Sequence, residues 1–228
     1  MSSFFNMDSP IMRFLSRICD LMILNILCII CCLPVVTAGA SITALYTITL
    51  KMVRGEESYI FKGFLKAFKE NFKQSTILWL IMAVLGLFIF VDYRAASFLP
   101  ENMSTIFRIL IGALLVLYLM VLTYVFPYTA RFENNIKNTF KNALLISILN
   151  LPWTLVLVVC PAALVFVTFL TPSTLVYGSM LWMLLGFAAV SSIIFRKIFA
   201  KYEPQEEENT SNPDAFSLPE EPADSEEN

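Results

Sequence analysis

Residues 18–53 read ICDLMILNILCIICCLPVVTAGASITALYTITLKMV and consist of two apolar runs separated by a short interruption. Its first part, about residues 18–36, is apolar and long enough to cross a bilayer, which takes about 20 residues of helix. Residues 34–39 contain a proline, a threonine and a glycine that interrupt the run, and a shorter apolar run follows at about residues 38–53. The two runs either cross the membrane one after the other or form a re-entrant hairpin.

Four more apolar runs extend this pattern, at about residues 75–92, 106–130, 146–170 and 174–195. The third of them starts in a longer apolar stretch, and its two prolines each remove a backbone donor and are expected to bend it. Hydrophobic residues make up 57% of the chain, above the range of about 45 to 50% in soluble domains. The sequence therefore predicts an all-α fold, a polytopic transmembrane helical bundle of five to six spans within residues 1–202.

The basic residues predict the sidedness of this bundle, because Lys and Arg accumulate in cytoplasmic loops. With six spans, fourteen of the 16 Lys and Arg residues fall on one side and only Arg94 and Arg108 on the other. The asymmetry also holds for a re-entrant hairpin. We therefore expect a multi-pass protein with both termini in the cytoplasm. A rival interpretation is a cleaved signal peptide, with Arg13 and Arg17 before the first apolar run and small residues at 38–40, but a second apolar run follows at once.

The C-terminal segment, residues 203–228, differs from the rest of the chain. It carries 10 acidic residues, no basic one and four prolines. Like charges repel and prolines interrupt helices, so this composition predicts a disordered acidic tail. The alternative is a docking segment for a basic partner.

Two amphipathic segments lie between the spans, at about residues 59–73 and 132–142. In the first, phenylalanines recur at helical spacing while lysines take the other faces, a pattern typical of an interfacial helix. Anionic lipid headgroups are the expected partners of its lysines, which are Lys62, Lys66, Lys69 and Lys73. Alternatively, the phenylalanines pack on the bundle below. The two segments also match at a spacing of 68 residues, Phe64 with Phe132 and Phe72 with Phe140, which suggests a parallel internal repeat of helix, interfacial helix and helix.

Catalytic and metal chemistry is poorly represented. The chain has no histidine, the commonest general base and a frequent metal ligand. Its cysteines lack a second ligand group at zinc spacing, and no pair of carboxylates is placed for acid and base catalysis. No phosphate-binding glycine loop is present. We therefore predict no catalytic residue, no cofactor, no metal and no nucleic-acid partner, and a protein that is not an enzyme.

The candidate functional residues form two groups. The first group surrounds the interruption in residues 18–53, where an amide and a broken helix leave polar groups that need partners inside protein; it consists of Asn25, Pro34, Thr37 and Gly39. These residues either line a ligand path or make a tight turn. The second group lies at the basic ends of the spans and consists of Arg54, Phe68, Asn71, Phe72 and Arg131. The two arginines either grip phosphate or carboxylate groups or are ordinary anchors.

These same residues carry a resemblance to a known family. The sequence resembles the pattern of the YesL-like family of bacterial integral membrane proteins, whose function is unknown. The matching residues are Asn25, the run Cys32 to Thr37, Gly39, Ala44 to Tyr46, Lys51, Arg54 to Glu56, Phe64 to Lys73 and Ala130 to Phe132. Ala38 and Ala40 depart from that pattern, which more often has a larger apolar residue and a proline. The resemblance implies a protein of the bacterial cytoplasmic membrane, often accompanied by ABC-type carbohydrate uptake systems. No residue roles come with it.

Two functional hypotheses follow. The first is a non-enzymatic accessory component of an ABC-type carbohydrate uptake system, with sugar permease subunits as partners and the interfacial helices and cytoplasmic loops as the contact surface. The second is a transporter or permease subunit in its own right, with the break at residues 34–39 near its path.

Overall fold

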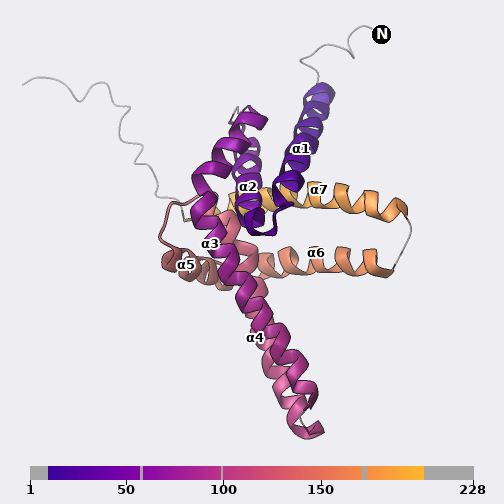
Figure 1. Cartoon of the computed structure of the whole chain (residues 1–228). Helices are drawn as coiled ribbons and strands as arrows, with labels where there is room; N and C mark the ends of the chain where they lie inside the picture. Colours follow the sequence, from indigo (N-terminus) through magenta and orange to yellow (C-terminus); the bar gives the residue numbers. More distant parts are fainter. Residues whose placement is uncertain (1–9, 57–58, 99, 171–173, 203–228) are drawn as a thin grey trace, which may run out of the picture.

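The computed structural model describes residues 10–56, 59–98, 100–170 and 174–202, and the acidic tail predicted at residues 203–228 lies outside them. Side chains are not described within residues 164–186. The described chain is helical and contains no strand (Figure 1), which confirms the all-α fold. Its elements are α1 (Pro10–Cys32), η1 (Val35–Thr37), α2 (Ala38–Arg54), α3 (Ile60–Ala95), η2 (Ala96–Phe98), α4 (Glu101–Thr129), α5 (Ile136–Leu149), α6 (Leu151–Leu170) and α7 (Thr174–Phe199).

Several of these helices are long and apolar enough to cross a membrane. Among the described residues, four stretches qualify by themselves: Leu15–Cys32, Val35–Arg54, Ile60–Phe98 and Asn102–Thr129. A fifth span is counted when the bent pair of α5 and α6 is taken as one. The chain is therefore a membrane protein with several apolar helices in lipid, while the six spans and their orientation stay predictions.

The interruption between the first two helices is a hydrogen-bonded turn. Pro34 is extended and precedes η1. The Thr37 hydroxyl donates to the carbonyl oxygens of Cys31 and Pro34, at 2.6 and 2.8 Å, so it satisfies backbone groups that the break exposes. At its other end α2 stops at Gly55, whose φ of 79° is a left-handed conformation that glycine adopts without strain.

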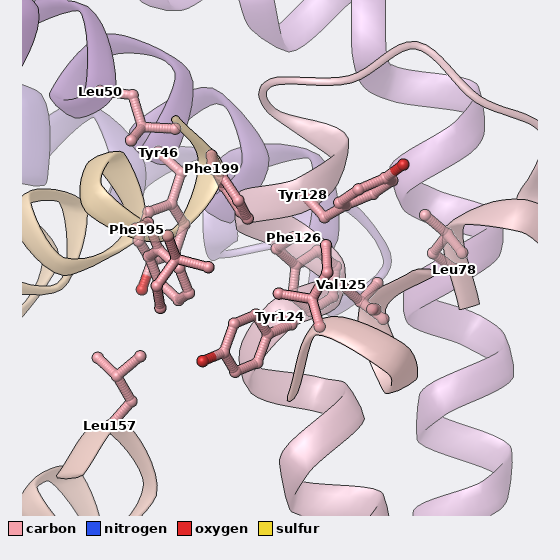
Figure 2. Close-up of a cluster of buried hydrophobic side chains, with 13 residues drawn as sticks. Tyr46, Leu50, Leu78, Tyr124, Val125, Phe126, Tyr128, Leu157, Phe195 and Phe199 are labelled. Carbon is pink, nitrogen blue, oxygen red and sulfur yellow. The ribbon is translucent and has the colours of Figure 1, made fainter. Parts of the chain in front are cut away.

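Helix α2 is the central helix of the described bundle. In its apolar stretch 56% of the residues are buried, compared with 17% to 28% in the other three qualifying stretches. Leu24 and Cys28 of α1 pack on one side of it, together with Phe64 of α3. Helix α7 packs on another side, where an aromatic cluster forms (Figure 2): the Phe195 ring meets the edges of Tyr46 and Tyr124 at centroid distances of 5.7 and 5.2 Å.

Helix α3 joins two elements that the sequence analysis separates. The interfacial segment 59–73 and the span 75–92 form one helix of 36 residues. Residues 74–76 are Gln, Ser and Thr, which are polar but include no helix breaker. At 1.5 Å per residue the helix is about 54 Å long, well beyond the hydrocarbon core of about 30 Å.

Only the first half of α3 lies beside the α1–α2 hairpin. A hydrogen bond of 2.9 Å joins Ser75 to Thr43, and Gly39, at the start of α2, lies against Ser75 and Trp79. The turn between α1 and α2 is therefore at the level of Ser75 to Trp79. Beyond it α3 and α4 continue as a two-helix hairpin (Figure 1), closed by a small apolar cluster that includes Ile89 and Ile111.

The chain bends sharply between α5 and α6, by 100° at Asn150. Pro152 lies in the first turn of α6, where its missing donor is tolerated, and Pro161 lies inside α6 without ending it. The bend expected from the prolines is therefore found at the first of them. Helices α6 and α7 run across the direction of α3 and α4 (Figure 1).

The proposed internal repeat is wrong. Phe64 is buried within α3, whereas Phe132 lies in the irregular connection between α4 and α5. Helix α3 also continues unbroken to Ala95, while the corresponding part of the second copy contains the 100° bend. The two segments share a spacing of aromatic and basic residues but follow different paths.

Candidate functional site

Buried hydroxyl groups connect α2 to its neighbours. On one side, the Ser75 hydroxyl of α3 donates to Thr43. On the other side, Thr49 and Ser192 of α7 bond at 2.7 Å, and Tyr46 and Ser191 at 3.3 Å. We call this set the hydroxyl seam; its members are Thr43, Tyr46, Thr49, Ser75, Ser191 and Ser192. In an apolar surrounding such bonds hold helices together, so the seam fixes α2 between α3 and α7.

Gly39 permits the close approach of α2 and α3 beside this seam. A Cβ atom at this position would lie 2.5 Å from the Ser75 carbonyl oxygen and 2.6 Å from the Trp79 Cβ. No real Cβ tolerates such contacts, and backbone atoms cannot give way as a flexible side chain would. The residues around the interruption, Pro34, Thr37 and Gly39, therefore come together in a packed turn.

Asn25 finds its hydrogen-bond partner within its own helix. It is buried on α1, and its side-chain nitrogen donates to the carbonyl oxygen of Leu21 in the same helix, at 3.0 Å. Two other buried hydroxyls, Ser41 Oγ and Thr76 Oγ1, have no hydrogen-bond partner among the described residues. These two atoms are the polar groups of the α2–α3 region that the packing leaves unused.

A polar hollow lies between α3 and the α4–α5 connection. We call it the carboxamide pocket; it has a volume of about 740 Å³ and is lined by Glu70, Asn71, Gln74, Glu133, Asn134, Asn135 and Asn138. Gln74 secures the connection to α3, because its side-chain nitrogen donates to the Asn134 carbonyl oxygen at 2.7 Å. Residues far apart in sequence thus form one site.

Hydrogen bonds inside the protein engage the side-chain nitrogens of three pocket residues, Asn71, Gln74 and Asn134. The Asn71 nitrogen donates to the Ala67 carbonyl at 3.0 Å, and the Asn134 nitrogen donates to the Tyr128 hydroxyl at 2.8 Å. The carboxamide oxygens of these residues and the carboxylates of Glu70 and Glu133 are acceptors. The pocket therefore suits a ligand group rich in hydrogen-bond donors, such as a guanidinium, an ammonium or a set of hydroxyls.

Of the second group of candidate residues, only Asn71 lines this pocket. Arg54 ends α2 and pairs with Glu56 at 3.7 Å, and Arg131 is exposed where α4 ends. Phe68 and Phe72 continue a row of rings that starts at the buried Phe64, with centroid distances of 6.3 and 5.4 Å. Among the phenylalanines of this part of α3, Phe64 packs on the bundle, whereas Phe61 and Phe72 are exposed by 57% and 36%.

Sequence reasoning missed most of the pocket. Four of its residues follow Arg131 closely in the run Glu133-Asn134-Asn135 and at Asn138. This concentration of carboxamide side chains directly after an apolar span is the sequence feature that could have predicted a polar site here. Among the described residues, no group of three or more side chains could hold a metal ion.

Comparison with known proteins gives two findings. Residues 21–93 match the family described as Protein of unknown function, DUF624. The Uncharacterized protein YteU of Bacillus subtilis (strain 168) is 27% identical over 137 residues, which are 60% of this chain and 61% of that protein. The chain thus spans less than two thirds of the length of this curated relative.

No solved structure matches the chain. The family match contains the α1–α2 turn, the hydroxyls of α2 and the whole length of α3 to Tyr93, and it ends before the α4–α5 connection that closes the carboxamide pocket. Both findings fit the expected resemblance to the YesL-like family, whose function is unknown, and residues 21–93 are the part of the chain that the family model matches.

Proposed function

We propose that this chain is a non-enzymatic accessory component of an ABC-type carbohydrate uptake system, set in the bacterial cytoplasmic membrane with both termini in the cytoplasm. The association with carbohydrate uptake comes from the YesL-like resemblance. The basic residues at the ends of the apolar helices support the orientation. Its partners would be sugar permease subunits and, at Lys62, Lys66, Lys69 and Lys73, anionic lipid headgroups.

The observation that best supports a partner-binding role is the carboxamide pocket. Its lining residues 133–135 directly follow the end of α4 near Arg131, a residue that is cytoplasmic in this orientation. Its acceptor groups suit a basic or hydroxyl-rich loop of a permease subunit, since Arg and Lys are donors only. By contrast, the centre of the bundle is closed by direct hydroxyl bonds such as Thr43 to Ser75, which favours a binding role over a transport path.

The test is co-purification with permease subunits after mild solubilisation and crosslinking. We expect Glu133→Lys to reduce the recovered permease severalfold, because it places a cation in a pocket that receives cations. Glu56→Lys is the matched control, a charge reversal of another exposed glutamate, next to Arg54 and outside the pocket. Absence of permease from crosslinked samples of the unaltered protein would count against the proposal, as would equal losses in the two variants.

The second candidate is a transporter or permease subunit, and the two unbonded hydroxyls favour it. Ser41 Oγ and Thr76 Oγ1 are buried polar atoms that a passing polar solute can engage. Uptake into proteoliposomes that depends on the purified chain alone would support this function. A path through the interrupted hairpin requires that Asn25→Ala and Thr37→Ala reduce such uptake, and unchanged uptake in both variants would exclude it.

A further inference from the structure

An apolar groove runs between the α3–α4 hairpin and α5. Its volume is about 480 Å³, and its walls include Phe88 of α3, Leu114 and Leu117 of α4, and Leu144 of α5. Two charged residues also line it, Lys141 and Asp92. The groove is separate from the carboxamide pocket, with which it shares no lining residue.

The two charged residues, Lys141 and Asp92, lie at different positions along the α3–α4 hairpin. The Gln74 side-chain nitrogen donates to the Thr139 hydroxyl of α5 at 3.4 Å, so α5 crosses α3 at Gln74. This crossing is about two helical turns before Met82, where the groove begins on α3. Lys141 is two residues after Thr139 on α5. Asp92 is ten residues beyond Met82, which is about 15 Å along a helix. Lys141 is therefore at the end of the groove near α2, and Asp92 is at the opposite end.

The hairpin that forms two walls of the groove is fixed. The Tyr118 hydroxyl donates to the Met82 carbonyl oxygen at 3.1 Å. A Cβ atom added at Gly86 would be only 2.8 Å from the same hydroxyl oxygen, so the glycine allows α3 and α4 to approach closely. These contacts hold α3 and α4 together as two walls of the groove, and α5 forms the third wall.

We propose that this groove binds one glycerophospholipid of the membrane, with an acyl chain along α3 and α4 and the phosphate on Lys141. The groove lies along the span 75–92, where the surrounding solvent is hydrocarbon. Its length and apolar walls suit a single alkyl chain, and a lysine beside an apolar surface extends its ammonium group toward the interface. The positive charge at this end complements a phosphate, whereas Asp92 is too far along the groove to meet the same headgroup. This site does not depend on the proposed function.

The test measures lipid binding to the purified full-length protein by native mass spectrometry and by thermal unfolding in detergent. We expect added phosphatidylglycerol to give a one-lipid adduct and to raise the Tm, while dioleoylglycerol, which has the chains but no phosphate, does so weakly. Lys141→Met keeps the apolar stem and should weaken the adduct about fivefold, equivalent to about 1 kcal/mol. Lys137→Met is the control, one helical turn earlier on α5 and outside the groove lining.

A second variant tests the groove itself. Leu114→Trp adds bulk to the apolar wall and should reduce the adduct while the protein keeps its helical circular dichroism. Equal effects of Lys137→Met and Lys141→Met would overturn the proposal in favour of nonspecific attraction of lipid to a basic surface. Equal binding of dioleoylglycerol and phosphatidylglycerol would overturn the role of the phosphate. Phosphatidylglycerol binding unaffected by Leu114→Trp would overturn the groove as the site, and a dimer that excludes lipid would assign the groove to a second copy.

Discussion

The two halves of α3 form one helix and have opposite surroundings. Residues 60–79 pack against α1 and α2, with Phe64 and Leu78 fully buried, and their outward face carries lysines. Residues 80–95 expose Leu87, Phe88 and Phe90, each by about three fifths of its surface. The first half is therefore packed against protein, and the exposed apolar surface of the second half suits contact with lipid. Helix continuity alone does not show where a membrane begins.

This difference bears on the interrupted hairpin of residues 18–53. One hydrocarbon core of about 30 Å cannot contain both halves of a helix about 54 Å long. The four lysines favour the first half as the part at the cytoplasmic boundary. The α1–α2 turn, which is level with Ser75 to Trp79, then stops far short of Asp92. This arrangement favours the re-entrant interpretation of the hairpin over two complete crossings.

Cysteine labelling gives the largest expected effect, because its outcome is all or none. In a background lacking the native cysteines, we expect Tyr93→Cys to react with a membrane-impermeant maleimide added to intact cells. Val36→Cys, at the turn, should stay unlabelled although its side chain is 53% exposed. Labelling of both positions from outside would mean that α1 and α2 cross completely. Labelling of Val36→Cys alone would indicate the opposite orientation of the protein in the membrane.

Removal of one aromatic ring from each half should give the next largest difference. Phe64→Ala leaves a cavity at a fully buried position and should lower the free energy of unfolding by about 3 to 5 kcal/mol. Phe90→Ala removes a ring that is 61% exposed and should change stability by less than about 1 kcal/mol. Thermal unfolding in detergent measures both. Similar losses would mean that a partner or second copy covers the outer half.

The glycines of the two regions provide a third comparison. Gly39→Ala forces a Cβ against the Ser75 carbonyl and Trp79, and overpacking of this kind costs about 1 to 3 kcal/mol. Gly112, on the outer part of α4, has nothing within 4 Å of the added Cβ, so Gly112→Ala should be neutral or slightly stabilising. Equal unfolding temperatures for the two variants would contradict the tight contact between α2 and α3.

The apolar runs of the sequence predicted the helices well, since each run needs a helix to satisfy its backbone in lipid. The prolines also predicted the bend before Pro152. The continuity of α3 was not predictable, because polar Gln74, Ser75 and Thr76 resemble a boundary although they suit a helix. The carboxamide pocket was hidden for another reason: Gln74 and Asn134 are 60 residues apart, and only tertiary packing brings them together.

The smallest expected effect concerns the hydroxyl seam. Thr43→Val keeps the shape of the side chain and removes the acceptor of the Ser75 hydroxyl, whose bond of 2.9 Å joins α2 to the first half of α3. Hydrogen bonds between membrane helices contribute about 0.6 kcal/mol on average, so the unfolding temperature should fall only slightly. Thr123→Val is the control, because its hydroxyl bonds only within α4, to the Leu119 carbonyl.

A double-mutant cycle with Ser75→Ala separates the pair from its surroundings. Thr43 also donates to the Gly39 carbonyl of its own helix, at 2.9 Å, so the single variant loses more than the contact between helices. We expect a coupling energy near 0.6 kcal/mol if the Thr43–Ser75 bond stabilises the packing of the two helices. A coupling energy of zero would leave the close approach at Gly39, rather than the seam, as what holds the first half of α3 to α2.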